Sequence, residues 1–299
     1  DHALTDGLGF ISLLNCLSDN YSVDLFPKVM QNKPSILAYI ISIILGPYYF
    51  ISNSAKNQST YTGDTPFKQS DPTKVKTGIP KIGISRQFDF NTLSDVAKKT
   101  KITINDLLSC LLSSSIKKYC QKHYRRVPEN VFMMIPVGSR SLPKNIDNID
   151  LANMSGGIGA LIKLVDDPIV ESKSISAELK KTVKNFPLIL ATNWFVDQLK
   201  KYLPDYTLKE MSTRTCTENV DLFFSNVPGP KDSLYYGGYK LIDMIPSFTP
   251  GQSNCFLGVV SYNGKYRLAV SLDTCLDMNP ETFISTVSEE IDLVIENNK

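Results

Sequence analysis

The chain has 299 residues, of which 42% are hydrophobic and 21% charged, a composition typical of one large or two moderate globular domains and not of a disordered tail. Its basic and acidic residues nearly balance, at a net charge of +2, and no arginine-rich stripe is interleaved with aromatic residues, so nucleic-acid binding has no support. The cysteines form no CxxC pair and no cluster with histidine at zinc spacing, so we expect no metal site and reduced, mostly buried thiols.

The first candidate site lies at the very start of the chain, in the segment His2–Gly7. The chain has only two histidines, so proton transfer by imidazole at neutral pH falls to His2 or His123. If a strand ends near His2, Asp6 can fold back to fix the loop and the ring, while Gly7 supplies a tight backbone bend. A short HxxxDG pattern also arises by chance, so a ragged strand with an ordinary histidine is the alternative. The abrupt start predicts that sequence once preceded the chain.

Two apolar segments follow this motif. The spacing from Phe10 to Leu14 predicts a short helix. The stretch from Pro34 to Ile51 carries no charge, but Gly46-Pro47 interrupts it. Three interpretations stay open: a segment that lies on or dips into a membrane surface, a buried helix or partner-covered patch, and a true membrane span.

Residues 52–81 change to a composition of Ser, Thr, Asn, Gln, Lys, Asp and Pro, which predicts a long exposed connection and a domain boundary. Beyond this connection we expect a strand over Ile82–Phe90 and a short helix over Asn91–Lys99.

Thr103 is the predicted N-cap of a longer helix, in which Asp106 completes a capping box. Asn105 and Asp106 are then explained as residues of the first helical turn. His123 falls at the cationic end of this helix and is interpreted as structural or solvent-facing. The apolar stripe of the helix consists of Ile104, Leu107, Leu108, Leu111, Leu112 and Ile116.

The second half of the chain mixes strands and helices, which predicts an α/β or α+β domain with a mixed sheet flanked by helices. Asn263-Gly264 predicts a hairpin turn, and Asn279-Pro280 predicts the start of a final helix. Strands are expected at Val131–Val137, Ile158–Val165, Val220–Ser225, Tyr239–Ile245, Cys255–Tyr262 and Lys265–Leu272, and helices at Ile169–Asn185 and Leu188–Leu203.

Three later segments carry polar residues where a strand does not need them. One apolar strand runs into Arg140, which could pair with a carboxylate or lie on a rim. Another ends on Ser225-Asn226 before two prolines, so we expect the hydroxyl and the amide to be held rigidly at a strand end. A polar turn, Thr249–Asn254, precedes the strand that ends in Ser261-Tyr262. Taken singly, each segment could be an ordinary turn. The three segments together, in this order along the chain, are the stronger indication of a functional site.

In this order the motifs resemble the wax ester synthase/diacylglycerol acyltransferase (WS/DGAT) family of the CoA-dependent acyltransferase superfamily. His2–Gly7 resembles the family's HHxxxDG motif, with Asp1 in the place of the first histidine. Thr103–Leu108 resembles its ND helix, and Ser225–Pro230 is the most specific element. Further landmarks are Pro136–Arg140 and Ser261–Gly264. The resemblance covers nearly the whole chain, least clearly residues 52–81.

The resemblance implies a fold of two similar α/β domains that face each other across a tunnel, with the motif histidine in the middle. Most of the family's N-terminal domain has no counterpart here, so the chain looks like a C-terminal portion. Residues 1–51 would be a remnant of the N-terminal domain, 52–81 a linker, and 82–299 the C-terminal acyltransferase domain.

The resemblance also implies an O-acyltransferase that moves a fatty acyl group from acyl-CoA to a long-chain alcohol or diacylglycerol. No cofactor is implied beyond acyl-CoA as co-substrate. The expected place is a membrane surface, at the endoplasmic reticulum or the cytoplasmic face of a membrane. The alternatives are a condensation-type acyltransferase that uses another acceptor and a catalytically silent domain that binds lipid or acyl-CoA.

In this mechanism His2 is the general base, Asp6 orients its loop, and Ser225 or Asn226 donates to the oxyanion. The chain contains no GxSxG motif, which agrees with a reaction that needs no acyl-enzyme. The remaining site residues implied by the resemblance would bind substrate: Gly7, Asn105, Asp106 and Arg140.

Overall fold

The computed structural model describes residues 5–26, 36–37, 40, 43–45, 47–48, 65–68, 73–124, 126–138, 146–149, 151, 155–184, 201–204, 207, 220–249 and 254–298. Two predicted site residues, His2 and Arg140, lie outside this part of the chain. So does the predicted helix over Leu188–Leu203, except for its last three residues, 201–203.

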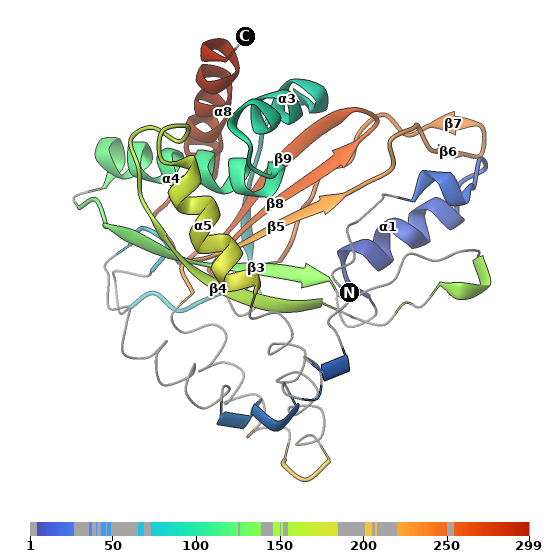
Figure 1. Cartoon of the computed structure of the whole chain (residues 1–299), viewed down its shortest axis with the longest axis horizontal. Helices are drawn as coiled ribbons and strands as arrows, with labels where there is room; N and C mark the ends of the chain where they lie inside the picture. Colours follow the sequence, from blue (N-terminus) through green and yellow to red (C-terminus); the bar gives the residue numbers. More distant parts are fainter. Residues whose placement is uncertain are drawn as a thin grey trace.

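A 7-stranded mixed sheet forms the centre of the molecule (Figure 1). The strands lie in the order β1-β9-β8-β5-β3-β4, and β2 also pairs with β9. β5 runs parallel to both β3 and β8, and the other pairs are antiparallel, so the predicted mixed sheet is confirmed. The bounds are β1 (Pro80–Ile84), β2 (Phe88–Asp89), β3 (Asn130–Gly138), β4 (Ser155–Lys163), β5 (Leu222–Pro228), β8 (Cys255–Tyr262) and β9 (Lys265–Asp273).

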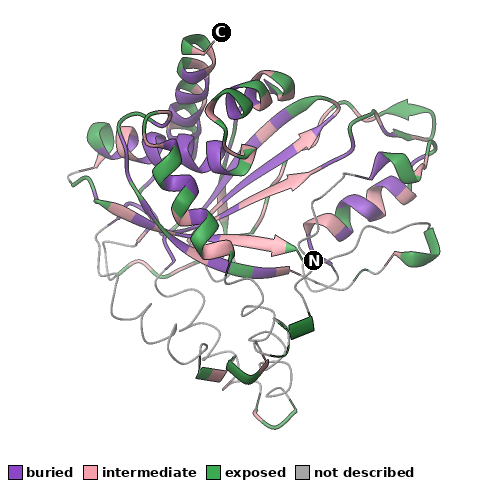
Figure 2. Cartoon of the chain, viewed as in Figure 1, coloured by how far each residue is buried: buried purple, intermediate pink, exposed green. Residues whose placement is uncertain are grey.

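Four helices gather on one side of this sheet: α3 (Phe90–Thr100), α4 (Ile104–His123), α5 (Ser172–Val183) and α8 (Pro280–Asn297) (Figure 1). The helices turn buried faces toward the sheet and toward one another (Figure 2). The predicted stripe of α4 is confirmed, because Leu107, Leu111 and Ile116 are at most 1% exposed and share a core cluster with strand residues. Burying one such side chain stabilises the fold by about 1.5–3 kcal/mol.

The predicted helix starts are also confirmed. Thr103 and Asp106 form the capping box of α4, and the side chain of Asn279 accepts a hydrogen bond from the backbone N–H of Thr282 at the start of α8. Asn263 and Gly264 both have positive φ, at 48° and 73°, as a tight hairpin turn requires.

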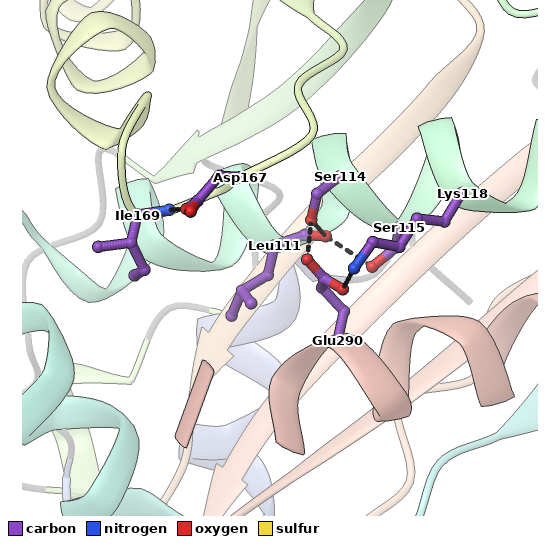
Figure 3. A network of polar contacts seen from close by, with 7 residues as sticks. All are labelled: Leu111, Ser114, Ser115, Lys118, Asp167, Ile169 and Glu290. Carbon is purple, nitrogen blue, oxygen red and sulfur yellow. Dashed lines mark hydrogen bonds and ion pairs between the residues drawn. The ribbon is translucent and has the colours of Figure 1, made fainter. Parts of the chain in front are cut away.

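A buried carboxylate joins α4 to α8 (Figure 3). Glu290 is 2% exposed, accepts a hydrogen bond from Ser114 Oγ at 2.8 Å and forms an ion pair with Lys118. Because a buried charge needs such partners, these contacts fix how the two helices pack together.

A smaller layer holds α1 (Gly7–Cys16), the helix predicted after the HxxxDG motif. It lies beside the hairpin of β6 (Tyr235–Tyr236) and β7 (Tyr239–Lys240) (Figure 1). Tyr236 Oη donates to the backbone oxygen of Leu14 at 2.8 Å. Leu14 of α1 and Tyr236 of β6 also pack against a second apolar cluster of Leu25, Leu234 and Tyr262, to which the short 3-10 helix η1 (Val23–Leu25) contributes Leu25. A further 3-10 helix, η2, covers Ile146–Asn148.

One predicted strand is shortened in the structure and another is divided in two. The strand expected over Tyr239–Ile245 is reduced to β7, and residues 241–249 instead cover the sheet face opposite α4. There the ring of Phe248 packs against that of Phe256, with centroids 3.9 Å apart and ring planes tilted by 31°, and Pro246, which has no N–H for a ladder, covers Gly258. The strand expected over Ile82–Phe90 is divided into β1 and β2.

The connection predicted as exposed over residues 52–81 is buried where the structure describes its centre. Thr65 is 0% exposed and donates to a carboxylate oxygen of Asp221 at 2.6 Å, while Phe67 is 1% exposed and packs edge-on against Phe283. The prediction of exposure is wrong at these positions, because it rested on the polar composition of the segment alone. One buried hydrogen bond and one buried aromatic ring are enough to anchor the segment to the domain.

In the uncharged stretch Pro34–Ile51, the described positions are helical, and Ile36, Leu37, Ile40 and Ile44 are exposed. A buried helix is therefore the wrong interpretation at these positions. Among the described residues, no helix combines the length and hydropathy that a membrane span requires.

Candidate functional site

The carboxyl end of β5 is paired on one side only. β5 pairs with β8 from Phe223 to Pro228, but with β3 only at Leu222 and Phe223. Beyond these residues β3 and β5 point apart (Figure 1). In open sheets, ligands bind outside the carboxyl ends of such parallel strands. The strand end predicted at Ser225-Asn226 is wrong, because pairing with β8 carries β5 on to Pro228, and a proline is tolerated where one side has no ladder.

Successive side chains of β5 point to opposite faces of the sheet. Leu222 and Phe224 belong to the core beneath the helices, so Asn226 points to the same face as α4. Ser225 shares the other face with Phe223, whose ring stacks parallel to that of Phe256. The two predicted oxyanion donors therefore do not point the same way.

Asn226 contacts the first turn of α4. Its Nδ2 donates to Oδ1 of Asn105 at 2.6 Å, although the residues are 121 positions apart in the chain. The other amide atom, Oδ1, is buried and has no hydrogen-bond partner among the described residues. An unpaired buried acceptor costs about 1–3 kcal/mol. Asn15 Oδ1, Tyr21 Oη and Arg267 Nε are also buried and unpaired among the described residues, but Asn226 Oδ1 lies at the carboxyl end of β5 and therefore directs attention to a ligand.

Asp106 holds this turn in place. Its carboxylate accepts hydrogen bonds from the backbone N–H of Thr103 at 3.2 Å and from Ser176 Oγ at 2.7 Å, and its side chain is buried. These contacts tie the start of α4 to α5. They also fix the position of Asn105, which is exposed at the second helical residue.

The described end of the HxxxDG motif packs where β3 and β5 diverge. Asp6 is 4% exposed and is the N-cap of α1, with its carboxylate accepting from the backbone N–H of Gly9 at 2.9 Å. A Cβ on Gly7 would lie 2.8 Å from Cγ2 of Val227, and a Cβ on Gly138 would lie 3.4 Å from Leu8. The start of α1 thus contacts the ends of both strands.

Gly7 therefore has a different role from the predicted one. It is the first residue of α1 and is not among the residues with positive φ. Its missing side chain is needed for the close approach to Val227, so the tight bend expected from the sequence is wrong. Val227 and Gly138 lie in two segments that carry the family resemblance, but the sequence assigned no role to either residue, because both act through contacts with residues far away in the chain.

The structure thus brings together three predicted site residues at one end of β5: Asn105 and Asn226 directly, and Gly7 through Val227, the neighbour of Asn226. Ser225 lies next to them on the opposite face. His123, the other histidine, ends α4 in an exposed position, as predicted.

The two thiols of α4 are buried and poorly suited to act as nucleophiles. Burial, with the charge of Asp106 adding to it, raises the pKa of Cys110 to about 12, and burial alone raises the pKa of Cys120 to about 12. Both side chains are 0% exposed, as the sequence predicted for its cysteines. In the described parts of the chain, no three His, Cys, Asp or Glu side chains gather in a way that could hold a metal ion.

The family comparison matches residues 158–294 to the model of the WS/DGAT C-terminal domain. Residues 158–294 are a WS/DGAT C-terminal domain. The family resemblance drawn from the motifs, and the assignment to a C-terminal portion, are confirmed. This WS/DGAT domain begins within β4, ends within α8 and contains Ser225 and Asn226, whereas Gly7 and Asn105 precede it.

Known proteins similar to this chain include the O-acyltransferase WSD of Acinetobacter baylyi, which is 24% identical over 214 residues, or 70% of this chain and 45% of that protein. The chain therefore spans less than half of that relative. Among solved structures, the wax ester synthase/diacylglycerol acyltransferase of Marinobacter aquaeolei superposes with a TM-score of 0.62 and 15% identity, covering 99% of this chain and 66% of that one.

The epimerization domain from the third module of tyrocidine synthetase B superposes with a TM-score of 0.58 and 11% identity, covering 99% of this chain and 67% of that one. At these identities the superpositions show the fold alone. They confirm the predicted mixed sheet flanked by helices, of the kind found in CoA-dependent acyltransferases and condensation domains.

Proposed function

We propose that the protein containing this chain is an O-acyltransferase that moves a fatty acyl group from acyl-CoA to a long-chain alcohol or diacylglycerol. The observation that carries the proposal is the Asn226 amide, which has one unpaired buried atom next to the start of α4 and beside the motif helix α1. The two relatives, an O-acyltransferase and a wax ester synthase/diacylglycerol acyltransferase, support the same reaction class.

In the proposed reaction, neutral His2 takes the proton of the acceptor hydroxyl as its oxygen attacks the thioester carbon. The C–O bond forms and the carbonyl becomes a tetrahedral oxyanion. When the C–S bond breaks, the imidazolium returns the proton to the leaving thiolate, so ester and free CoA thiol are the products. No cofactor enters these steps.

The oxyanion requires a positioned donor, and Nδ2 of the Asn226 amide supplies it in the orientation in which Oδ1 instead accepts from Asn105. One such donor is worth about 3 kcal/mol, or roughly a hundredfold to a thousandfold in rate. Ser225, on the other face of the sheet, is the second candidate. Asp6, as the N-cap of α1, orients the loop that carries His2.

The other predicted site residues have supporting roles in this proposal. Gly7 lets α1 approach β5, and Asp106 holds the helix turn that carries Asn105. Arg140 would contact acyl-CoA or the Asp6 carboxylate, at the end of the segment that follows β3.

The proposed place of action is a membrane surface, at the endoplasmic reticulum or another cytoplasmic face, where both lipid substrates dissolve. The exposed apolar positions Ile40 and Ile44 support it. Replacing both by Asp should shift the protein from sedimenting lipid vesicles to the supernatant, because charged side chains oppose interfacial insertion. Identical sedimentation of wild type and variant would contradict this placement.

The function itself is tested by measuring ester formation from labelled acyl-CoA with hexadecanol or diacylglycerol as acceptor. His2→Ala should lower turnover by about two to four orders of magnitude, because it removes the general base. His123→Ala is the matched control and should retain wild-type turnover, since that residue is exposed at the far end of α4.

Comparable turnover in wild type and His2→Ala would contradict the mechanism. Binding of labelled acyl-CoA without turnover in wild type would indicate a silent binding domain instead. Turnover only with carrier-protein-bound donors would indicate a condensation-type acyltransferase.

A further inference from the structure

The side chains of Asn105 and Asn226 can share one hydrogen bond in two orientations. As drawn in the structure, Asn226 Nδ2 donates to Asn105 Oδ1 at 2.6 Å, which leaves Asn226 Oδ1 buried and without a partner among the described residues. If both amides turn over, Asn105 Nδ2 donates to Asn226 Oδ1 and the hydrogen bond is kept. The unpaired atom is then Nδ2, which is a donor.

Two features favour this second orientation when an oxyanion forms. The first turn of α4 carries partial positive charge, which attracts the amide oxygen of Asn226 toward Asn105. An oxyanion beside the outward atom of Asn226 attracts Nδ2 and repels Oδ1. Asn105 is exposed, so its own outward atom bonds to water in either orientation.

We propose that Asn105 is a positioning residue that sets which atom of the Asn226 amide faces the acyl carbonyl. This inference rests on the proposed function, in which Asn226 is the oxyanion donor. Asn105 can do this because it is able to donate as well as accept, and because Asp106 fixes the turn on which it lies. A residue that can only accept should hold the amide in the unproductive orientation.

Asn105→Asp tests this directly, because a carboxylate accepts only and would retain Asn226 Nδ2, leaving Oδ1 toward the oxyanion. We expect kcat to fall about a hundredfold to a thousandfold, with the KM for acyl-CoA changed less than about twofold. Asn105→Ala removes the hydrogen-bond partner and leaves the amide free to turn, so its kcat should fall less than about tenfold.

Stability separates this role from a structural one. Aspartate in the first turn of a helix is favourable, so Asn105→Asp should melt at or above the wild-type temperature. Its turnover should nevertheless be lower than that of Asn105→Ala. The matched control is Asn91→Asp. Asn91 is also exposed at the second residue of a helix, α3, so this variant adds the same charge in the same helical position and should keep wild-type kcat.

Each remaining outcome decides one question. Suppose that Asn226→Ala lowers kcat a hundredfold or more but that Asn105→Asp turns over no more slowly than Asn105→Ala. The role of Asn105 is then overturned and the proposed function stands. If Asn226→Ala keeps wild-type turnover, Asn226 is not the oxyanion donor and the positioning role of Asn105 is overturned, whereas the O-acyltransferase function is decided separately by ester formation and by His2→Ala.

Discussion

The two ends of β5 differ in how their polar side chains are satisfied. At the amino end, Asp221 is 0% exposed, and its carboxylate accepts from Thr65 Oγ1 at 2.6 Å and from the backbone N–H of Phe132 at 2.7 Å. At the carboxyl end, Asn226 keeps a buried Oδ1 that has no partner in the described part of the chain. The amino end is paired with β3, and the carboxyl end has lost that neighbour.

Under the proposed function, this difference separates a structural from a functional polar side chain along residues 221–226. A buried polar group with all its partners stabilises a unique packing, whereas one with a missing partner costs about 1–3 kcal/mol. Asp221 belongs to the first kind, because it anchors the segment around Thr65 to the sheet. Asn226 belongs to the second kind, because its Oδ1 lacks a donor among the described residues. In the proposed second orientation of the amide, Nδ2 takes that place and an acyl carbonyl would supply the acceptor.

The largest expected effect is on catalysis at the carboxyl end. Asn226→Ala should lower turnover by about a hundredfold or more, because a transition-state donor is lost. Its affinity for acyl-CoA and its melting temperature should change little. Turnover, acyl-CoA binding and thermal unfolding of Asn226→Ala are compared with those of Ser225→Ala, which lies on the other face. A melting temperature that falls while the rate per folded molecule stays constant would assign Asn226 to the fold instead.

The opposite pattern is expected at the amino end. Asp221→Ala leaves Thr65 Oγ1 and the backbone N–H of Phe132 buried without an acceptor, so the free energy of unfolding should fall by about 2–5 kcal/mol. Turnover per folded molecule should remain near wild type. Chemical denaturation checks the first quantity and an active-fraction assay the second. Loss of turnover in the fully folded variant would erase the distinction between the two ends.

A smaller effect is expected where α1 approaches β5. Gly7→Ala places a Cβ 2.8 Å from Val227 Cγ2, so it should destabilise α1 packing by about 1–3 kcal/mol. Val227→Ala removes that clash, so the double variant Gly7→Ala/Val227→Ala should recover part of the loss. A double-mutant cycle on unfolding free energies measures this coupling. Strictly additive effects would show that Gly7 does not depend on Val227.

The sequence by itself determined the local structure. The Thr103–Asp106 capping box, the Asn279 cap, the Asn263-Gly264 turn and the apolar stripe of α4 all follow from contacts between residues a few positions apart. The family was also evident from the order of the motifs, and the polar residues near the end of β5 were found as candidates. The roles of His2 and Arg140 stay predictions.

Only the tertiary structure decided how these residues meet. The Asn105–Asn226 hydrogen bond, the approach of Gly7 to Val227 and the anchoring of Thr65 by Asp221 join residues more than a hundred positions apart. The opposite directions of Ser225 and Asn226 also depended on how far β8 extends the strand. Local patterns cannot specify such contacts, because they depend on strand order and on where the pairing of β3 with β5 ends.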